Sequence, residues 1–256
     1  MSSLKSIAIV PARFESTRFP GKPLVTIAQK TMIQHVYERS LQAESVSEVI
    51  VATDDLRILQ AVEAFGGQAR MTSPTHRSGT DRVAEVAASS DAEVIVNVQG
   101  DEPLIDPAAL DAVVEPFQSD PNLMISTLSV DGTDGEWENP NVVKVVVDHH
   151  GFALYFSRAP IPFFRDASAG TGEQRRFWKH VGLYAYRRSF LTRLATMKES
   201  YLEKAEALEQ LRFLENGYRI KVVNSTYQSL AVDTPEDLER VNAFIKEHAW
   251  QPSSSL

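Results

Sequence analysis

Cysteine is absent from the 256 residues of this chain. The absence excludes disulfides, thiolate zinc sites, iron–sulfur clusters and thiol catalysis, and it fits a reducing compartment. Long apolar runs are absent too, since none approaches the roughly 20 residues that a membrane-spanning helix needs. The apolar run at residues 6–10 is too short for a signal peptide and basic residues follow it. We therefore expect a cytoplasmic protein without a membrane segment.

Basic residues are in deficit, with 26 lysines and arginines against 34 aspartates and glutamates, for a formal net charge of −8. A domain that covers nucleic acid needs the opposite balance, so we expect no nucleic-acid partner. An anionic substrate would need a local basic cluster. The hydrophobic content of 43% is ordinary for a globular protein. A chain of this length can bury about three quarters of its unfolded surface, which favours one elaborated domain.

Apolar strands alternate with amphipathic helices in the first hundred residues. The predicted strands lie at 6–10, 48–52, 68–71 and 93–98, and the predicted helices at 32–41, 56–65 and 81–88. This alternation favours right-handed crossovers and a doubly wound, mostly parallel sheet of the α/β class. Ligands of such sheets bind beyond the carboxyl ends of the strands, so the chemistry is expected after Val10, Ala52 and Val98.

The second half of the chain is less regular. Helices are predicted at 107–117, 187–197, 200–214 and from Thr234 onward, and strands at 123–130, 142–147, 152–157, 180–186 and 219–224. The segment between the strands at 142–147 and 152–157 is typical of a hairpin turn. Residues 159–179 are expected to form a mobile loop and residues 251–256 a disordered tail.

The first candidate site is the basic loop at residues 11–24, which follows the first strand. It carries Arg13, Arg18 and Lys22 with Glu15 as its one acid. Arginine suits bidentate contact with phosphate and lysine a point contact, while free backbone N–H groups can face an anion. The loop lacks the spacing of a P-loop or of a dinucleotide-binding glycine motif. We interpret it as a cradle for a triphosphate, with a solvated basic loop as the alternative.

Two aspartates are candidate ligands for Mg²⁺. Asp101 directly follows the strand at 93–98, and Mg²⁺ favours one or two carboxylates together with phosphate oxygens and water. Asp233 precedes the last helix, where acidic residues are routine, so a metal role there depends on the chain folding back to Asp101. A turn or capping role is the alternative for both. The six histidines show no metal-binding spacing, and His180 is a candidate substrate contact.

Eight segments, taken in order, resemble the 3-deoxy-manno-octulosonate (Kdo) cytidylyltransferases, or CMP-Kdo synthetases. They are PARFESTRFPGKPL at 11–24, VATDD at 51–55, MTSPTHRSGTDR at 71–82, VNVQGDEP at 96–103, ALYFSRAPIP at 153–162, KHVGLYAY at 179–186, LEQLR at 208–212 and VDTPEDLERV at 232–241. Collinear similarity from about residue 5 to 245 is far more specific than any one motif.

The resemblance implies a sugar-nucleotidyltransferase version of the fold, usually dimeric, with an inserted hairpin. One domain would span residues 1–250, with a nucleotide-binding half at about 5–130 and sugar-binding and dimerisation elements at about 131–230. The implied reaction transfers CMP from CTP to the anomeric hydroxyl of Kdo with Mg²⁺, releasing pyrophosphate and activating the sugar for lipopolysaccharide synthesis. Positioning and charge neutralisation should dominate over covalent chemistry. We take the hairpin at 142–157 as part of the dimer surface.

The resemblance also implies which residues make the site. It assigns Arg13, Arg18 and Lys22 to the CTP phosphates; Ser78, Gly79, Thr80, Asp81 and Arg82 to the cytidine, mostly through backbone atoms; Asp101 and Asp233 to Mg²⁺; and Gln99, Arg158, His180, Tyr184, Glu209 and Gln210 to the sugar. Arg13, Lys22, Asp101 and Asp233 are the implied catalytic residues. A sugar acid offers a carboxylate and hydroxyls, which arginine, histidine and amide groups bind well. A polar helix face is the alternative for Glu209 and Gln210.

One stretch departs from the family pattern. Members that act on Kdo often carry a glycine-containing segment similar to GTGVD before the C-terminal aspartate, whereas this chain has Gln228-Ser229-Leu230-Ala231-Val232-Asp233. The stretch resembles relatives that use 8-amino-3,8-dideoxy-manno-octulosonate, which is the alternative substrate. A nucleotidyltransferase for another sugar and a non-catalytic nucleotide-binding module are further alternatives.

Overall fold

The computed structural model describes residues 4–15, 19–76, 78–165, 176–194, 196–227 and 230–247. Its strands are β1 (Ser6–Ala12), β2 (Thr26–Ile27), β3 (Lys30–Thr31), β4 (Val46–Thr53), β5 (Ala69–Met71), β6 (Val94–Asn97), β7 (Ile125–Asp131), β8 (Lys144–Val147), β9 (Ala153–Ser157), β10 (Trp178–Arg187) and β11 (Ile220–Asn224). Its α-helices are α1 (Met32–Ser40), α2 (Leu56–Ala64), α3 (Gly79–Ala88), α4 (Pro107–Val114), α5 (Pro116–Ser119), α6 (Arg188–Leu194), α7 (Tyr201–Glu206), α8 (Gln210–Glu215) and α9 (Pro235–Glu247). Short 3-10 helices lie at η1 (Lys22–Leu24) and η2 (Asp134–Glu136). Across these ranges no helix is both long and apolar enough to cross a lipid bilayer.

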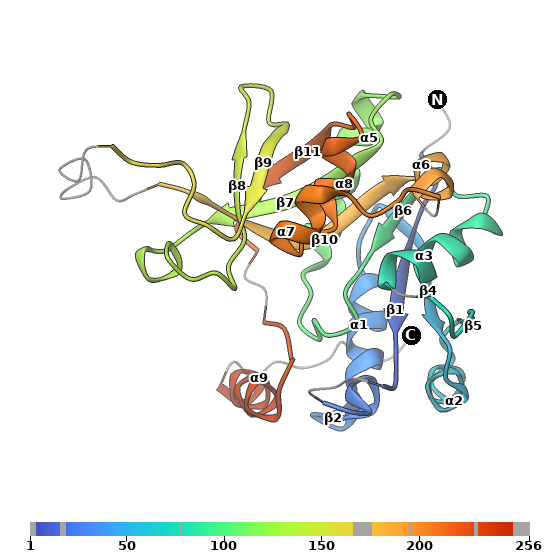
Figure 1. Cartoon of the computed structure of the whole chain (residues 1–256). Coiled ribbons are helices and arrows are strands. Elements are labelled where there is room, and N and C mark those ends of the chain that lie inside the picture. The colour runs from blue at the N-terminus through green and yellow to red at the C-terminus, as the bar shows by residue number, and fades with distance from the viewer. Residues whose placement is uncertain are drawn as a thin grey trace.

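The main sheet runs in the order β11-β7-β10-β6-β1-β4-β5, with the hairpin β8–β9 attached to β10 (Figure 1). β1 pairs in parallel with β4 and β6, β4 with β5, and β11 with β7. β10 runs antiparallel to both of its main neighbours, β6 and β7. The mostly parallel α/β sheet expected from the sequence is therefore confirmed, with one antiparallel strand at its centre.

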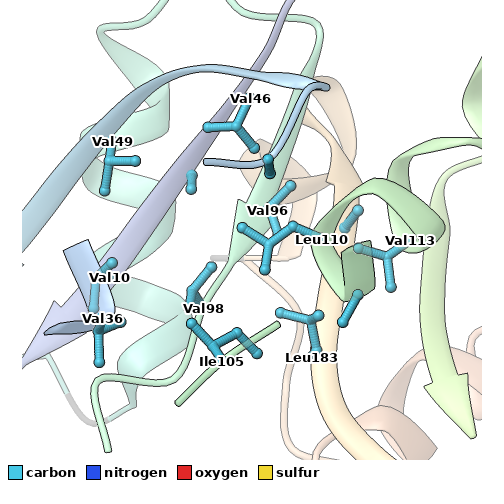
Figure 2. Close-up of a cluster of buried hydrophobic side chains, with 14 of the residues drawn as sticks. Val10, Val36, Val46, Val49, Val96, Val98, Ile105, Leu110, Val113 and Leu183 are labelled. Atoms are coloured by element: carbon cyan, nitrogen blue, oxygen red, sulfur yellow. The ribbon is translucent and has the colours of Figure 1, made fainter. Parts of the chain in front are cut away.

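Both faces of the sheet are covered, as a doubly wound fold requires. Ala8 and Val10 of β1 pack into a cluster with side chains of α1, α2 and α4, several of which Figure 2 shows. Ile7 and Ile9, which alternate with them, pack into a second cluster with α3, α6 and α8. Successive side chains of a strand point to opposite faces, so a strand buried on both reads as a continuous apolar run.

Two predicted helices are broken in the structure. The helix expected at 200–214 divides into α7 and α8 at Ala207, whose φ of 51° is left-handed. The helix expected at 107–117 ends at Glu115, before Pro116 starts the single turn of α5. Proline has no backbone N–H and clashes with the preceding turn, which explains the second break. The first break depends on tertiary contacts described below.

A small third cluster fixes the C-terminal segment. Val232 is fully buried and packs with Val241 and Ile245 of α9 and with Ile27 and Met32 near the start of α1. Figure 1 shows α9 beside β2, far from the hairpin β8–β9. This packing brings the residue after Val232 to the end of β6.

Candidate active site

Two carboxylates from distant parts of the chain meet at one lysine side chain. Lys22 Nζ lies 2.9 Å from Asp101 Oδ2 and 3.1 Å from Asp233 Oδ1. Lys22 begins η1, Asp101 lies in the loop after β6, and Asp233 precedes α9. Their side chains are 15%, 28% and 37% exposed. The structure therefore places the two candidate metal ligands beside each other, within reach of solvent and of a bound ligand.

Asp233 is held in place mainly through its backbone. The N–H of Val232 donates to the carbonyl of Asp101 at 2.8 Å, which joins the two segments directly. The carboxylate of Asp237 accepts hydrogen bonds from the N–H groups of Asp233 at 2.9 Å and Thr234 at 3.0 Å. Partial burial raises the pKa of Asp237, but these hydrogen bonds outweigh it and hold that pKa below its usual value. Asp237 therefore stays ionised as the cap that sets the direction of the chain at Asp233.

The loop after β6 and the first residue of α3 both pack closely on Pro11, near the end of β1. A Cβ on Gly100 would lie 2.8 Å from the carbonyl oxygen of Pro11, and one on Gly79 would lie 3.2 Å from the Pro11 ring. The contact at Gly100 is with backbone, which cannot move aside easily. Glycine at this position lets the end of β6 approach the end of β1, so that the candidate ligands after each strand come together.

The basic loop closes on itself at a glycine. The N–H of Gly21 donates to the carbonyl of Phe14 at 2.8 Å, and Gly21 has a left-handed φ of 73°, which favours glycine. Arg13 Nη2 donates to the carbonyl of His76 at 3.0 Å. Arg13 therefore lies between the loop and the segment before α3, and Arg18 falls outside the described residues.

The first turn of α3 carries a capping box. The Ser78 hydroxyl accepts from the N–H of Asp81 at 3.1 Å, and the Asp81 carboxylate accepts from the N–H of Ser78 at 3.1 Å. The Thr80 hydroxyl donates to Glu209 Oε2 at 2.6 Å. This contact connects the predicted nucleotide segment with α8, where two of the predicted sugar residues lie.

Arg82, the last residue of the predicted nucleotide segment, is fully buried. Its Nη2 donates to Asp54 Oδ2 at 2.7 Å and its Nη1 to the hydroxyl of Thr72. The guanidinium group is therefore engaged inside the fold, and only backbone atoms of this residue are left to face a ligand.

A pocket of about 920 Å³ opens between α3, the end of β6 and the α7–α8 pair. Its volume lies in the range of about 300–1,000 Å³ typical of small-molecule sites. Gln99, which donates to the carbonyl of Gly182 at 3.3 Å, lines the pocket two residues before Asp101. The predicted residues that line the pocket are Ser78, Gly79, Thr80, Asp81, Gln99 and Glu209. One cavity therefore joins residues of the predicted nucleotide and sugar groups.

A charged cluster in this pocket was missed by the sequence-based prediction. Arg212 donates from Nε to Glu203 Oε2 at 2.8 Å, and its Nη2 lies 3.9 Å from Glu209 Oε1. Burial raises the pKa of Glu209, and the hydrogen bond from Thr80 and the charge of Arg212 only partly offset this. The break at Ala207 brings Arg212 and Glu203 together across two helices, and no local sequence pattern signals that break.

His180 and Tyr184 belong to the aromatic packing of β10. The His180 ring lies edge-on to Phe156 with centroids 4.9 Å apart, and its Nε2 is 3.0 Å from the hydroxyl of Thr127. Loss of hydration lowers the pKa of His180 to about 3, so the imidazole is neutral near pH 7. Burial, together with the charge of Glu209, raises the pKa of Tyr184 well above its usual value. Neither side chain is ionised at neutral pH.

Arg158 is held by backbone carbonyl groups. It donates from Nε to Glu206 at 2.7 Å, from Nη1 to Pro140 at 3.0 Å and from Nη2 to Ala207 at 3.3 Å. The guanidinium group thereby ties the end of the hairpin to the end of α7. Gln210 is 6% exposed in the first turn of α8. Neither Arg158 nor Gln210 lines the pocket, although each adjoins a residue that does.

The comparisons with known proteins agree with this geometry. The profile of the family described as Cytidylyltransferase matches residues 7–220. The chain belongs to this cytidylyltransferase family. A 3-deoxy-manno-octulosonate cytidylyltransferase of Solibacter usitatus is 57% identical over 248 residues, covering 96% of this chain and 97% of that protein. A second, of Geotalea daltonii, is 56% identical over 251 residues and covers 95% and 99%.

A solved structure supports the same assignment. A CMP:2-keto-3-deoxy-manno-octonic acid synthetase complexed with CTP superposes on this cytidylyltransferase with a TM-score of 0.90. The two are 46% identical, over 95% of this chain and 99% of the other. The expected family and the sugar-nucleotidyltransferase type of α/β fold are therefore confirmed.

The carboxylates of this cytidylyltransferase fit a hard divalent cation. Asp101 and Asp233 already share one positive charge, the Lys22 ammonium. Among the residues the structure describes, no three His, Asp or Glu side chains form a ready-made metal cluster. Two carboxylates leave most of an octahedral shell to phosphate oxygens and water, which is how Mg²⁺ is commonly held beside a nucleotide.

A buried pair behind the site was also missed by the sequence-based prediction. The Tyr227 hydroxyl donates to Glu102 Oε2 at 2.6 Å, and both residues are buried. Glu102 follows Asp101 in the chain but its side chain points into the fold. This hydrogen bond adds a second tie between the C-terminal segment and the loop after β6.

Proposed function

We propose that this chain transfers CMP from CTP to the anomeric hydroxyl of Kdo and releases pyrophosphate. The observation that carries the proposal is the meeting of Lys22 with Asp101 and Asp233 beside a pocket that joins both predicted substrate regions. Relatives of more than half identity over nearly the whole chain carry the name of this activity. Activation of Kdo in this form serves lipopolysaccharide synthesis.

The nucleotide would bind at the ends of β1 and β6. Arg13, Arg18 and Lys22 are the proposed phosphate ligands, because they are the cations of the loop that follows β1. The backbone of Ser78 to Arg82 is proposed to face the cytidine, which agrees with the buried side chain of Arg82 and the open turn of α3. These groups bind and orient the α-phosphorus for attack.

The sugar is proposed to occupy the pocket toward α8. Gln99 and Glu209 line the pocket directly. Arg158, His180, Tyr184 and Gln210 complete the proposed sugar residues from the surrounding shell. A pKa of about 3 makes the His180 imidazole a weak base, and the ring is flanked by aromatic rings, so we propose that it positions the sugar and does not act as a general base.

The reaction is an in-line displacement. The anomeric oxygen forms a bond to the α-phosphorus while the bond from that phosphorus to the β-bridging oxygen breaks, and the hydroxyl proton is released to solvent. Pyrophosphate leaves with the electron pair of the broken bond. Mg²⁺, held by Asp101 and Asp233, would neutralise phosphate charge. Arg13 and Lys22 would stabilise the negative charge that develops on the leaving pyrophosphate.

We propose further that the chain acts as one domain and as a homodimer in the cytoplasm, without a nucleic-acid partner. Leu154 of β9 and Phe163, which follows the hairpin, are 62% and 87% exposed. Large apolar side chains in such positions support the hairpin as part of a subunit interface. The absence of cysteine supports the cytoplasmic location, and the net charge of −8 supports the lack of a nucleic-acid partner.

The test is pyrophosphate release with CTP and Mg²⁺, with Kdo and its 8-amino analogue assayed side by side. We expect turnover with Kdo, and a higher kcat/KM for Kdo than for the analogue. A higher value for the analogue would reassign the substrate and point to the altered stretch before Asp233. Binding of CTP without turnover on either sugar would contradict the proposed function.

A further inference from the structure

The ammonium group of Lys22 lies where the proposed metal ion would bind. Lys22 Nζ is within 3.1 Å of a carboxylate oxygen of Asp101 and of one of Asp233. Two carboxylates brought this close repel each other unless a cation lies between them. In the nucleotide-free protein the lysine side chain supplies that cation.

The backbone around Lys22 is fixed while its side chain can move. Gly21 has its left-handed φ of 73° and hydrogen bonds to Phe14, and Pro23 is buried directly after the lysine. The lysine itself has four rotatable methylene carbons and a compact charge that can move between partners. A shift of the ammonium group from the carboxylates to a neighbouring phosphate therefore requires only side-chain rotation.

We infer that Lys22 is a built-in counter-ion that occupies the cation site of the nucleotide-free protein and moves to the triphosphate when CTP binds. The inference rests on the proposed function, because it takes Asp101 and Asp233 as the metal ligands. A free divalent cation must displace the ammonium group before it can bind both carboxylates. CTP draws the ammonium group away with its own phosphates, so the metal and the nucleotide bind together.

This exchange makes metal binding and CTP binding reciprocal. If CTP increases the affinity for the metal by removing a competing charge, the metal must increase the affinity for CTP by the same factor. The free protein would hold its two carboxylates in their working positions at all times. Without nucleotide it would nevertheless bind little metal. A site that already holds Mg²⁺ before CTP arrives would behave in the opposite way.

The test measures binding of Mn²⁺ to the nucleotide-free protein by electron paramagnetic resonance. Mn²⁺ is the probe because it accepts the same oxygen ligands as Mg²⁺. Lys22→Met removes the charge and keeps an unbranched side chain. We expect the variant to bind Mn²⁺ at least about tenfold more tightly than the wild type, since one competing charge at contact distance is lost. The variant should also bind CTP more weakly.

Lys30→Met is the matched control, because Lys30 Nζ makes a comparable pair with Glu38 Oε2 at 2.5 Å, outside the site. It should leave the affinity for Mn²⁺ unchanged. Lys22→Gln is a second neutral variant in case the methionine variant folds poorly, and it should show the same direction of change. Unchanged or weaker Mn²⁺ binding in a folded Lys22 variant would overturn the inference.

Asp101→Asn separates this inference from the proposed function. The metal site stands and only the role of Lys22 is wrong if three results hold: CTP-loaded wild type binds Mn²⁺ more tightly than free CTP does, Asp101→Asn removes that gain, and the Lys22 variants gain nothing. If Asp101→Asn leaves Mn²⁺ binding intact with CTP present, the metal assignment fails and the inference fails with it. Tighter Mn²⁺ binding in Lys22→Met that Asp101→Asn reverses in the double variant would support both.

Discussion

Charged side chains have different roles in the two halves of this molecule. Beyond the ends of β1 and β6, Lys22, Asp101 and Asp233 meet with side chains 15–37% exposed, where a ligand can reach them. In the half built from the hairpin and α7, Arg158 and Lys144 are occupied by the fold itself. A charged residue in a family motif is thus a ligand candidate in one half and a structural support in the other.

Lys144 makes all of its hydrogen bonds to groups within the fold. It is fully buried, and its ammonium group donates to the carbonyls of Asn139, Val142 and Arg158 at 2.6–3.0 Å. Burial lowers its pKa, which the nearby charge of Glu206 partly offsets. Lys144 therefore holds the ends of the hairpin together, and Arg158 ties the hairpin to the end of α7.

The largest expected effect is a loss of turnover when a charge of the candidate metal site is removed. Asp101→Asn keeps the size of the side chain and removes a metal ligand, so it should lower kcat by about two to four orders of magnitude. Thermal unfolding should change little. Asp91→Asn, at an exposed pair with Lys5 on the surface, is the control and should leave kcat unchanged. Near-normal turnover in the Asp101 variant would remove it from the chemistry.

The ion pair of Arg82 with Asp54 lies in the same half as the candidate metal site. It tests whether charged residues in that half can also serve stability. The Arg82 side chain, which pairs with Asp54, is fully buried, whereas the Arg57 side chain, which pairs with Asp55, is 58% exposed. Arg82→Met would leave Asp54 and Thr72 without their partner and should cost about 3 kcal/mol of unfolding free energy. Arg57→Met should cause a much smaller change, since exposed pairs contribute little. Equal costs in denaturant unfolding would refute the distinction.

The fold of the first half could be predicted because its signals are local. Asp55, Ser78 and Asp106 each cap the helix that was expected to follow them, and the apolar runs became the parallel strands. The face of α2 was less predictable. Leu56 is as apolar as its neighbours but is 61% exposed, whereas Ile58 and Val62 are buried. Only packing on the sheet decides between such neighbours.

The site could be predicted in part, because motif residues and strand ends mark where a ligand binds. The meeting of Asp233 with Asp101 could not be read from spacing, since it depends on a backbone hydrogen bond across more than a hundred residues. The break at Ala207 also lies at a contact from outside the two helices, a side-chain hydrogen bond from the guanidinium of Arg158. A left-handed alanine costs about 1–2 kcal/mol, which only contacts from elsewhere in the fold can offset.

Arg158 tests whether a charged residue beside the hairpin supports the fold, binds the sugar, or does both. Arg158→Lys keeps the charge but cannot span the three carbonyl groups, so it should lower the unfolding free energy by about 2 kcal/mol. Arg219→Lys, at an exposed pair with Asp148 near the same hairpin, should change stability little. If Arg158 also contacts the sugar, KM for Kdo should rise in the lysine variant while KM for CTP stays constant. A large rise in KM without loss of stability would move Arg158 from support to ligand.

The smallest expected effect is a pH dependence from His180. Its pKa is about 3 in the folded protein and 6.5 ordinarily, so below pH 6.5 the unfolded chain binds a proton that the folded protein does not. The contribution of this residue to stability is therefore fully present above pH 6.5 and falls as the pH drops toward 3. Between pH 7.5 and 5.5 the wild type should lose about 1 kcal/mol that His180→Asn does not lose. Urea unfolding of both proteins at the two pH values measures this difference. A constant difference would mean that His180 is hydrated and available as an acid or base in the sugar pocket.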